Sequence, residues 1–180
     1  MELARHAIVE AVCHGRVLSL PPPAGRWAER AGVFVSLHRQ GRLCGCIGQV
    51  ESSDSLAATV VHCAIGAATK DPRFHPPHAE DLAELEIEIS ILSPPEPVQP
   101  EAIEIGRHGL VVSHGARRGV LLPHVAVAQG WTREQFLEET CAKAGLEPRA
   151  WEDPGVRLLA FTAEIFSEAE LSVERQRQVG

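Results

Sequence analysis

Aromatic residues are scarce in this sequence, and tyrosine is absent. Phenylalanine and tryptophan together make up 4% of the 180 residues. Proteins that bind single-stranded nucleic acid use several exposed aromatic rings as platforms on which the bases stack. The formal net charge of −7 also opposes contact with a phosphate backbone. Composition therefore disfavours nucleic acid as a partner.

Long apolar segments are missing as well. No uninterrupted apolar run reaches the roughly 18 residues that a membrane span requires. Glu2, Arg5 and Glu10 interrupt the start of the chain, where a signal peptide would carry a continuous apolar stretch. We therefore expect a cytoplasmic protein, in which the five cysteines are reduced rather than paired in disulfides.

The sequence also lacks the spacings of several common catalytic and metal sites. No glycine-rich segment follows a strand and opens a helix as in phosphate-binding loops, and no G-x-S-x-G elbow is present. His75 and His78 have a ligand-like gap, but the two prolines between them hold the chain extended. No third ligand stands at a recognisable spacing from them. We therefore predict neither a metal site nor a cofactor.

The spacing of the apolar residues predicts an α+β fold. Steps of three and four residues indicate helices, and strict alternation over 84–92 indicates a strand with one buried face. Thr132 and Gln135 have the spacing of a capping box at the start of a helix. Two pairs of strands are close enough to form hairpins, so we expect a mostly antiparallel sheet with helices packed on one face. The expected helices span 2–17, 55–69, 125–129 and 132–145, and the expected strands span 33–37, 43–50, 84–92, 110–113, 119–122 and 156–166.

The segment Cys44-Gly45-Cys46 places two thiols two residues apart in an expected strand, and so on one face. If a two-residue turn joins this strand to the preceding one, Cys44 lies opposite Leu37 and Cys46 lies opposite Val35. Both thiols then point into the core and behave as small, unreactive apolar groups. A register shift of one residue would turn them to the other face.

Several segments, in the same order along the chain, resemble the AMMECR domain family. Its bacterial and archaeal members are known as AmmeMemoRadiSam system protein A. Leu43–Gly48 reads LCGCIG and is similar to the family signature LRGCIG, with Cys44 in place of the arginine. His124 is a second departure, at a position where glutamine is expected. Ordered matches are far more specific than a single motif. The other matching segments are 33–37, 67–74 with its DPRF turn, 88–95, 106–110 and 119–123.

The resemblance implies a mixed α+β fold in two subdomains, within one domain over 1–168. We expect a smaller lobe around 100–125 and a charged C-terminal tail at 169–180. The family has no established biochemical activity. Its members resemble one component of a three-part system that includes a Memo-like protein and a radical S-adenosylmethionine protein, which are the expected partners.

We expect the matching segments to converge on one cleft between the lobes, because strand ends and neighbouring loops present polar groups on a rigid frame. Cys46 is the candidate catalytic residue. The residues expected at the cleft are Gly45, Cys46, Ile47, Gly48, Asp71, Arg73, Phe74, Arg107, His108 and Gly109.

The main functional hypothesis is an accessory or substrate-handling component of such a system, because the sequence shows no complete catalytic set. One alternative is a small cysteine-dependent enzyme that uses Cys46, and a second alternative is a nucleic-acid-associated regulator. An accessible Cys46 with a cation beside it would favour the enzyme.

Overall fold

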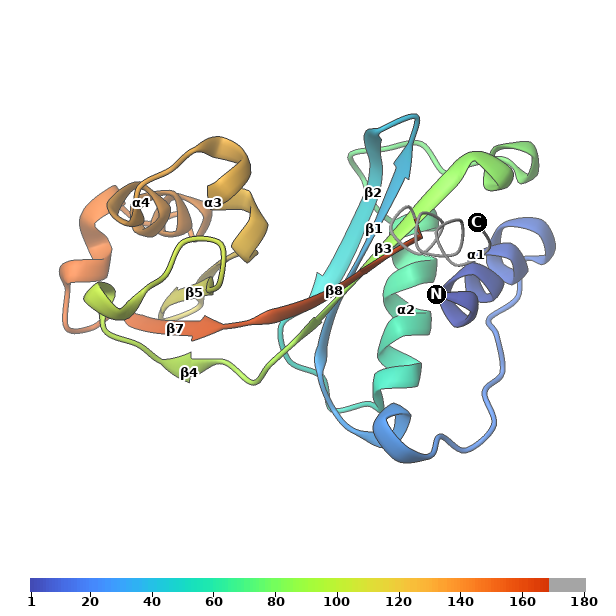
Figure 1. Ribbon diagram of the computed structural model, residues 1–180, viewed down its shortest axis with the longest axis horizontal. Coiled ribbons are helices and arrows are strands. Elements are labelled where there is room, and N and C mark those ends of the chain that lie inside the picture. Colours follow the sequence, from blue (N-terminus) through green and yellow to red (C-terminus); the bar gives the residue numbers. More distant parts are fainter. Residues whose placement is uncertain (169–180) are drawn as a thin grey trace, which may run out of the picture. The chain divides into compact units, whose positions relative to one another are not determined.

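The computed structural model describes residues 1–168, which fold into helices and two four-stranded sheets (Figure 1). The predicted α+β class with antiparallel pairing is confirmed, and the strands form two sheets where one was expected. The tail predicted at 169–180 lies outside the described residues. Residues 1–168 divide into two units, one formed by 1–91 with 164–168 and the other by 92–163. Within residues 1–168, no helix combines the length and the apolar character needed to cross a membrane.

The first unit is a four-stranded sheet with the order β2-β1-β3-β8 and two long helices. Helix α2 packs against β1 and β2, and α1 packs against α2, as Figure 1 shows. Short 3-10 turns at Gly25–Ala28 and Ala79–Glu84 precede β1 and β3. The elements are α1 (Glu2–His14), β1 (Gly32–Arg39), β2 (Arg42–Gln49), α2 (Leu56–Thr69), β3 (Leu85–Leu92) and β8 (Ala163–Ser167).

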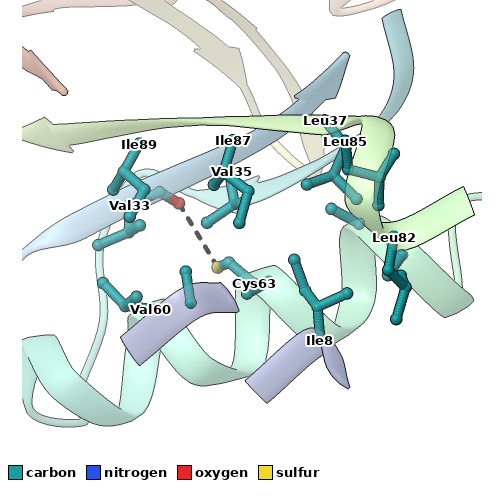
Figure 2. Close-up of a cluster of buried hydrophobic side chains, with 14 of the residues drawn as sticks. Ile8, Val33, Val35, Leu37, Val60, Cys63, Leu82, Leu85, Ile87 and Ile89 are labelled. Atoms are coloured by element: carbon teal, nitrogen blue, oxygen red, sulfur yellow. Dashed lines mark hydrogen bonds between the residues drawn. The ribbon is translucent and has the colours of Figure 1, made fainter. Parts of the chain in front are cut away.

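The core of the first unit lies between its sheet and its helices (Figure 2). Alternate residues of β1 and β3 are fully buried there, as the pattern over 84–92 predicted. Cys63 of α2 lies among them, and its Sγ is 3.6 Å from the Val33 carbonyl oxygen. Burial raises the pKa of Cys63 to about 11, so this thiol is protonated at neutral pH. The members of this core that are labelled in Figure 2 include Ile8, Val33, Val35, Leu37, Val60, Ile87 and Ile89.

The second unit has its own sheet, with the order β4-β7-β5-β6 and antiparallel pairing throughout. The expected capping box is present, since Thr132 and Gln135 bond each other's backbone N–H groups. The single strand expected over 156–166 is instead two strands, because the chain leaves this sheet at Thr162 and enters the other sheet. The elements are β4 (Glu96–Pro97), β5 (Gly109–His114), β6 (Arg117–Leu121), α3 (Pro123–Gln129), α4 (Arg133–Lys143) and β7 (Arg157–Phe161), with 3-10 turns at Pro100–Ala102 and Pro148–Glu152.

The β1–β2 hairpin has the predicted two-residue turn but not the predicted register. Gln40 and Gly41 both have positive φ, 51° and 72°, as a type I′ turn requires. A β-bulge follows, because Leu37 pairs with Gly45 while His38 pairs with Leu43.

Cys44 is the extra residue of this bulge, and beyond it every pair is shifted by one residue. Cys46 therefore lies opposite Ser36, and Val35 lies opposite Ile47. The prediction that Cys46 points into the core beside Val35 is wrong, since Cys46 shares the face of β1 that carries Ser36.

Candidate functional site

The signature segment forms β2, an edge strand that approaches α2 unusually closely. A Cβ atom on Gly45 would lie 2.2 Å from the Ala67 carbonyl oxygen, and one on Gly48 would lie 2.2 Å from the Phe34 ring. Between them, the Ile47 side chain packs over Gly66 of α2. These signature residues are therefore required by packing, and their identity carries no separate evidence of chemistry.

The turn that follows α2 closes the exposed edge of β2. The Asp71 carboxylate accepts the backbone N–H of Cys46 at 2.9 Å, and the Arg73 guanidinium donates to the Cys46 carbonyl at 3.1 Å. Both backbone groups of Cys46 are thus paired on the side that faces away from β1. A free strand edge offers such groups to other chains, so Asp71 and Arg73 occupy a potential strand-pairing site.

Asp71 and Arg73 form an ion pair in which one partner is buried and the other is not. The guanidinium donates to both carboxylate oxygens, at 2.9 and 2.7 Å. The Asp71 side chain is 2% exposed, whereas the Arg73 side chain is 58% exposed. The hydrogen bonds from Arg73 hold the pKa of Asp71 well below its usual range, and Asp71 in turn raises the pKa of Arg73. Both groups are therefore charged at neutral pH.

Phe74, the last residue of the DPRF turn, packs its ring against the Arg73 guanidinium. The Arg73 guanidinium carbon lies 5.3 Å from the centroid of the Phe74 ring, within the range of a cation–π contact. The guanidinium is thus held by the ring, by Asp71 and by the Cys46 carbonyl at the same time.

The two cysteines of the signature have different surroundings because Cys44 is the extra residue of the bulge, whereas Cys46 pairs with Ser36 beyond it. The Cys46 thiol is half-buried and accepts a hydrogen bond from the Ser36 hydroxyl at 3.4 Å. The Cys44 thiol donates to the Leu37 carbonyl at 3.3 Å and packs against the core of the first unit. Burial raises the pKa of Cys44. Cys44 therefore matches the predicted small apolar group, and Cys46 does not.

The other three residues expected at the cleft lie in the second unit. The Gly109 backbone passes beneath the Phe161 ring, where a Cβ atom would lie 2.4 Å from ring carbons. Arg107 donates to both carboxylate oxygens of Glu104, at 3.0 and 3.2 Å. His108 accepts the Glu104 backbone N–H through Nδ1 at 3.0 Å. The convergence of these three residues with those of the first unit remains a prediction.

Comparison with known proteins gives the chain its family. The sequence model of AMMECR1 matches residues 1–166. The chain belongs to the AMMECR1 family. A Thermococcus gammatolerans protein is 46% identical over 181 residues, covering 93% of this chain and 88% of that protein. A Thermococcus kodakarensis protein is 45% identical with the same coverage. The crystal structure of an uncharacterized protein from Pyrococcus horikoshii matches with a TM-score of 0.87 at 41% identity, covering 93% of this chain and 88% of that one.

Two sets of contacts made by the predicted residues of this AMMECR1-family protein, one in each unit, were not expected from the sequence. Ser36 is the hydroxyl beside Cys46, and its signal is a polar residue inside the otherwise apolar segment 33–37 of β1. Glu104 orders both Arg107 and His108, and nothing in its spacing marks that role. Within residues 1–168, no three His, Cys, Asp or Glu side chains are grouped closely enough to hold a metal ion.

Replacing Asp71 by asparagine is expected to change how stability depends on pH in this AMMECR1-family protein. A carboxylate whose pKa is lower in the folded state than in the unfolded state stabilises the fold at pH values above the unfolded-state pKa, which is about 3.9 for aspartate. That contribution is lost as the pH falls through the lower folded-state pKa. In urea titrations, the stability difference between wild type and Asp71→Asn should shrink by about 1 kcal/mol between about pH 5 and pH 3. A difference that stays constant down to pH 3 would contradict this assignment.

Proposed function

We propose that this AMMECR1-family protein is a cytoplasmic accessory component that handles a substrate together with a Memo-like protein and a radical S-adenosylmethionine protein. The main observation behind the proposal is that both carboxylate oxygens of Asp71 already accept hydrogen bonds within the protein. Its carboxylate is tied to the guanidinium of Arg73 and to the backbone N–H groups of Cys46 and Arg73. It therefore has no free role as a base beside the Cys46 thiol.

The neighbours of the Cys46 thiol support a binding role over a catalytic one. The Ser36 hydroxyl donates to the sulfur, and a hydroxyl is not a base at neutral pH. The nearby charge of Arg73 is balanced by Asp71. Within residues 1–168, no histidine forms a hydrogen bond with this thiol. A thiol without a base and beside a cation whose charge is already balanced is poorly suited to attack a substrate.

Direct binding tests this proposal. The purified protein is mixed with a Memo-like protein and a radical S-adenosylmethionine protein, separately and together, and complexes are measured by size-exclusion chromatography and calorimetry. We expect a complex with a Kd on the order of 1 μM or tighter, retained by Cys46→Ala. The absence of any complex at about 100 μM of each protein would reject the proposal.

A small cysteine-dependent enzyme is the second candidate, and the orientation of Cys46 favours it. The thiol lies outside the helix-facing core, and the Arg73 guanidinium reaches the carbonyl of the same residue. A neighbouring cation stabilises a thiolate and makes it more reactive.

Alkylation of the native protein separates the two candidates. Iodoacetamide modification is followed site by site with mass spectrometry, with exposed Cys13 as the reference and buried Cys63 and Cys141 as controls for unfolding. The accessory reading predicts that Cys46 reacts no faster than Cys13. Reaction about tenfold faster than Cys13 would favour the enzyme.

A further inference from the structure

The second unit contains a hollow of about 360 Å³ where three of its strands end. Its volume lies in the range of small-molecule sites, which is roughly 300–1,000 Å³. Polar side chains of Glu96, Arg107, His108 and Thr162 line it, above a floor that includes Ala160 and Val98. All of these residues belong to the second unit, so the hollow is complete without the first.

Strand register places Glu96 and His108 on the same face of this sheet. Strand β7 lies between β4 and β5, as Figure 1 shows. Glu96 of β4 pairs with Ala160, and Gly109 of β5 pairs with Phe161, so the preceding His108 lies beside Thr162. Directly opposed residues share a face. The backbones of β4 and β5 are two strand spacings apart, about 10 Å, and the small Ala160 leaves the space between Glu96 and His108 open.

One end of the hollow offers hydrogen-bond donors. His108 Nδ1 accepts the Glu104 backbone N–H, so the neutral ring carries its proton on Nε2 and presents a donor. Arg107 uses only its Nη1 group for Glu104, and the side chain is 63% exposed. Its Nε and Nη2 groups therefore remain for a ligand. A guanidinium with an adjacent N–H donor is the arrangement that binds a carboxylate.

The other end offers an acceptor of opposite charge. The Glu96 carboxylate forms no ion pair within residues 1–168, and it lies opposite Ala160 rather than beside His108. A carboxylate accepts hydrogen bonds from an ammonium group. A purely anionic ligand would face Glu96, and a purely cationic ligand would face Arg107, so either one would meet a charge of its own sign.

We propose that this hollow binds a zwitterionic small molecule of the α-amino acid class. The ligand carboxylate lies at Arg107 and His108, and the ligand ammonium lies at Glu96. The apolar floor at Ala160 and Val98 receives a small or medium apolar side chain. This site goes beyond the function proposed for the Cys46 region and does not depend on it.

Calorimetry with the full chain tests this assignment. Each standard L-amino acid is titrated, and any that binds is repeated as its N-acetyl and methyl ester forms, which remove the ammonium or the carboxylate charge. We expect at least one free amino acid to bind with a Kd on the order of 1 mM or tighter and each blocked form to bind about tenfold more weakly. Failure of every amino acid to bind at about 10 mM, or equal binding of the blocked forms, would overturn the proposal.

Side-chain variants locate the binding. Glu96→Gln and Arg107→Gln should each weaken binding by about tenfold or more. Arg149→Gln is the matched control, because Arg149 also forms a surface ion pair with a glutamate three residues away, in the same unit. Circular dichroism checks that each variant is folded. If Arg149→Gln weakens binding as much as Arg107→Gln does, the assignment to this hollow is wrong.

Discussion

Replacing Gly45 by alanine is expected to lower the free energy of unfolding by about 3 kcal/mol. The new methyl group would lie 2.2 Å from the Ala67 carbonyl oxygen and 3.5 Å from Leu37 Cδ1. The carbonyl belongs to the backbone of α2, so it cannot rotate away as a side chain could. Either β2 or α2 must move, and both contribute to the buried core of the first unit. Because whole domains are stable by only about 5–15 kcal/mol, this loss is large.

Urea unfolding of Gly45→Ala measures this loss, and Gly155→Ala is its control. A methyl group on Gly155 would meet the Asp153 and His114 side chains at 3.3 and 3.4 Å, and such side chains are able to shift. Its expected effect is within about 1 kcal/mol. Similar losses in both variants would show that the contact between β2 and α2 is looser than the structure indicates.

Replacing Asp71 by alanine is expected to cost about 2–3 kcal/mol. The change leaves the Cys46 backbone N–H without its acceptor and removes the carboxylate that holds the Arg73 guanidinium. Breaking a fully buried ion pair costs about 3–5 kcal/mol. The cost here is lower because Arg73 is 58% exposed and water solvates it once Asp71 is gone.

Glu104→Ala is the matched control for Asp71→Ala, since Glu104 also pairs with an arginine but is 59% exposed. An exposed ion pair contributes about 0–1 kcal/mol, so this variant should remain close to wild type in the same urea titration. A double-mutant cycle with Arg73→Ala gives the interaction energy between Asp71 and Arg73 directly. If Asp71→Ala costs no more than Glu104→Ala, Asp71 does not hold the edge of β2.

The parts of the fold that were predicted correctly depend on local chemistry. Alternation along β3 identifies its buried face, because successive strand residues point to opposite sides. The reciprocal bonds of Thr132 and Gln135 span a single helical turn. The turn at Gln40 and Gly41 requires positive φ, which glycine adopts without strain. Each of these signals is complete within a few neighbouring residues.

The register of β2 was not predictable in the same way, because a contact distant in sequence determines it. The bulge at Cys44 brings Gly45, and not Cys44, opposite Leu37 and against the Ala67 carbonyl. A glycine is needed at that position, but the need arises from the Ala67 carbonyl of α2, more than twenty residues later in the sequence. The face of Cys46 follows from this register.

The candidate site was predictable as a set of residues but not as a set of contacts. The resemblance pointed to Asp71 and Arg73, and the structure shows that both bond to the backbone of Cys46. Those bonds depend on where α2 ends relative to the edge of β2, which no local pattern encodes. The division of the segment 156–166 into two strands at Thr162 is likewise not local, because β7 and β8 belong to different sheets.

The pairing of β3 with β8 has a consequence for the order in which the chain folds. The second unit is inserted between these two strands, and its ends meet where the Ser93 backbone N–H bonds the Thr162 carbonyl at 3.0 Å. Before that unit folds, joining β3 to β8 closes a loop of about 70 residues, and the entropic cost grows with loop length. Once it has folded, its two ends already lie side by side, and β8 is delivered to β3 almost as in a hairpin. Slow folding of the second unit therefore delays the completion of the first sheet.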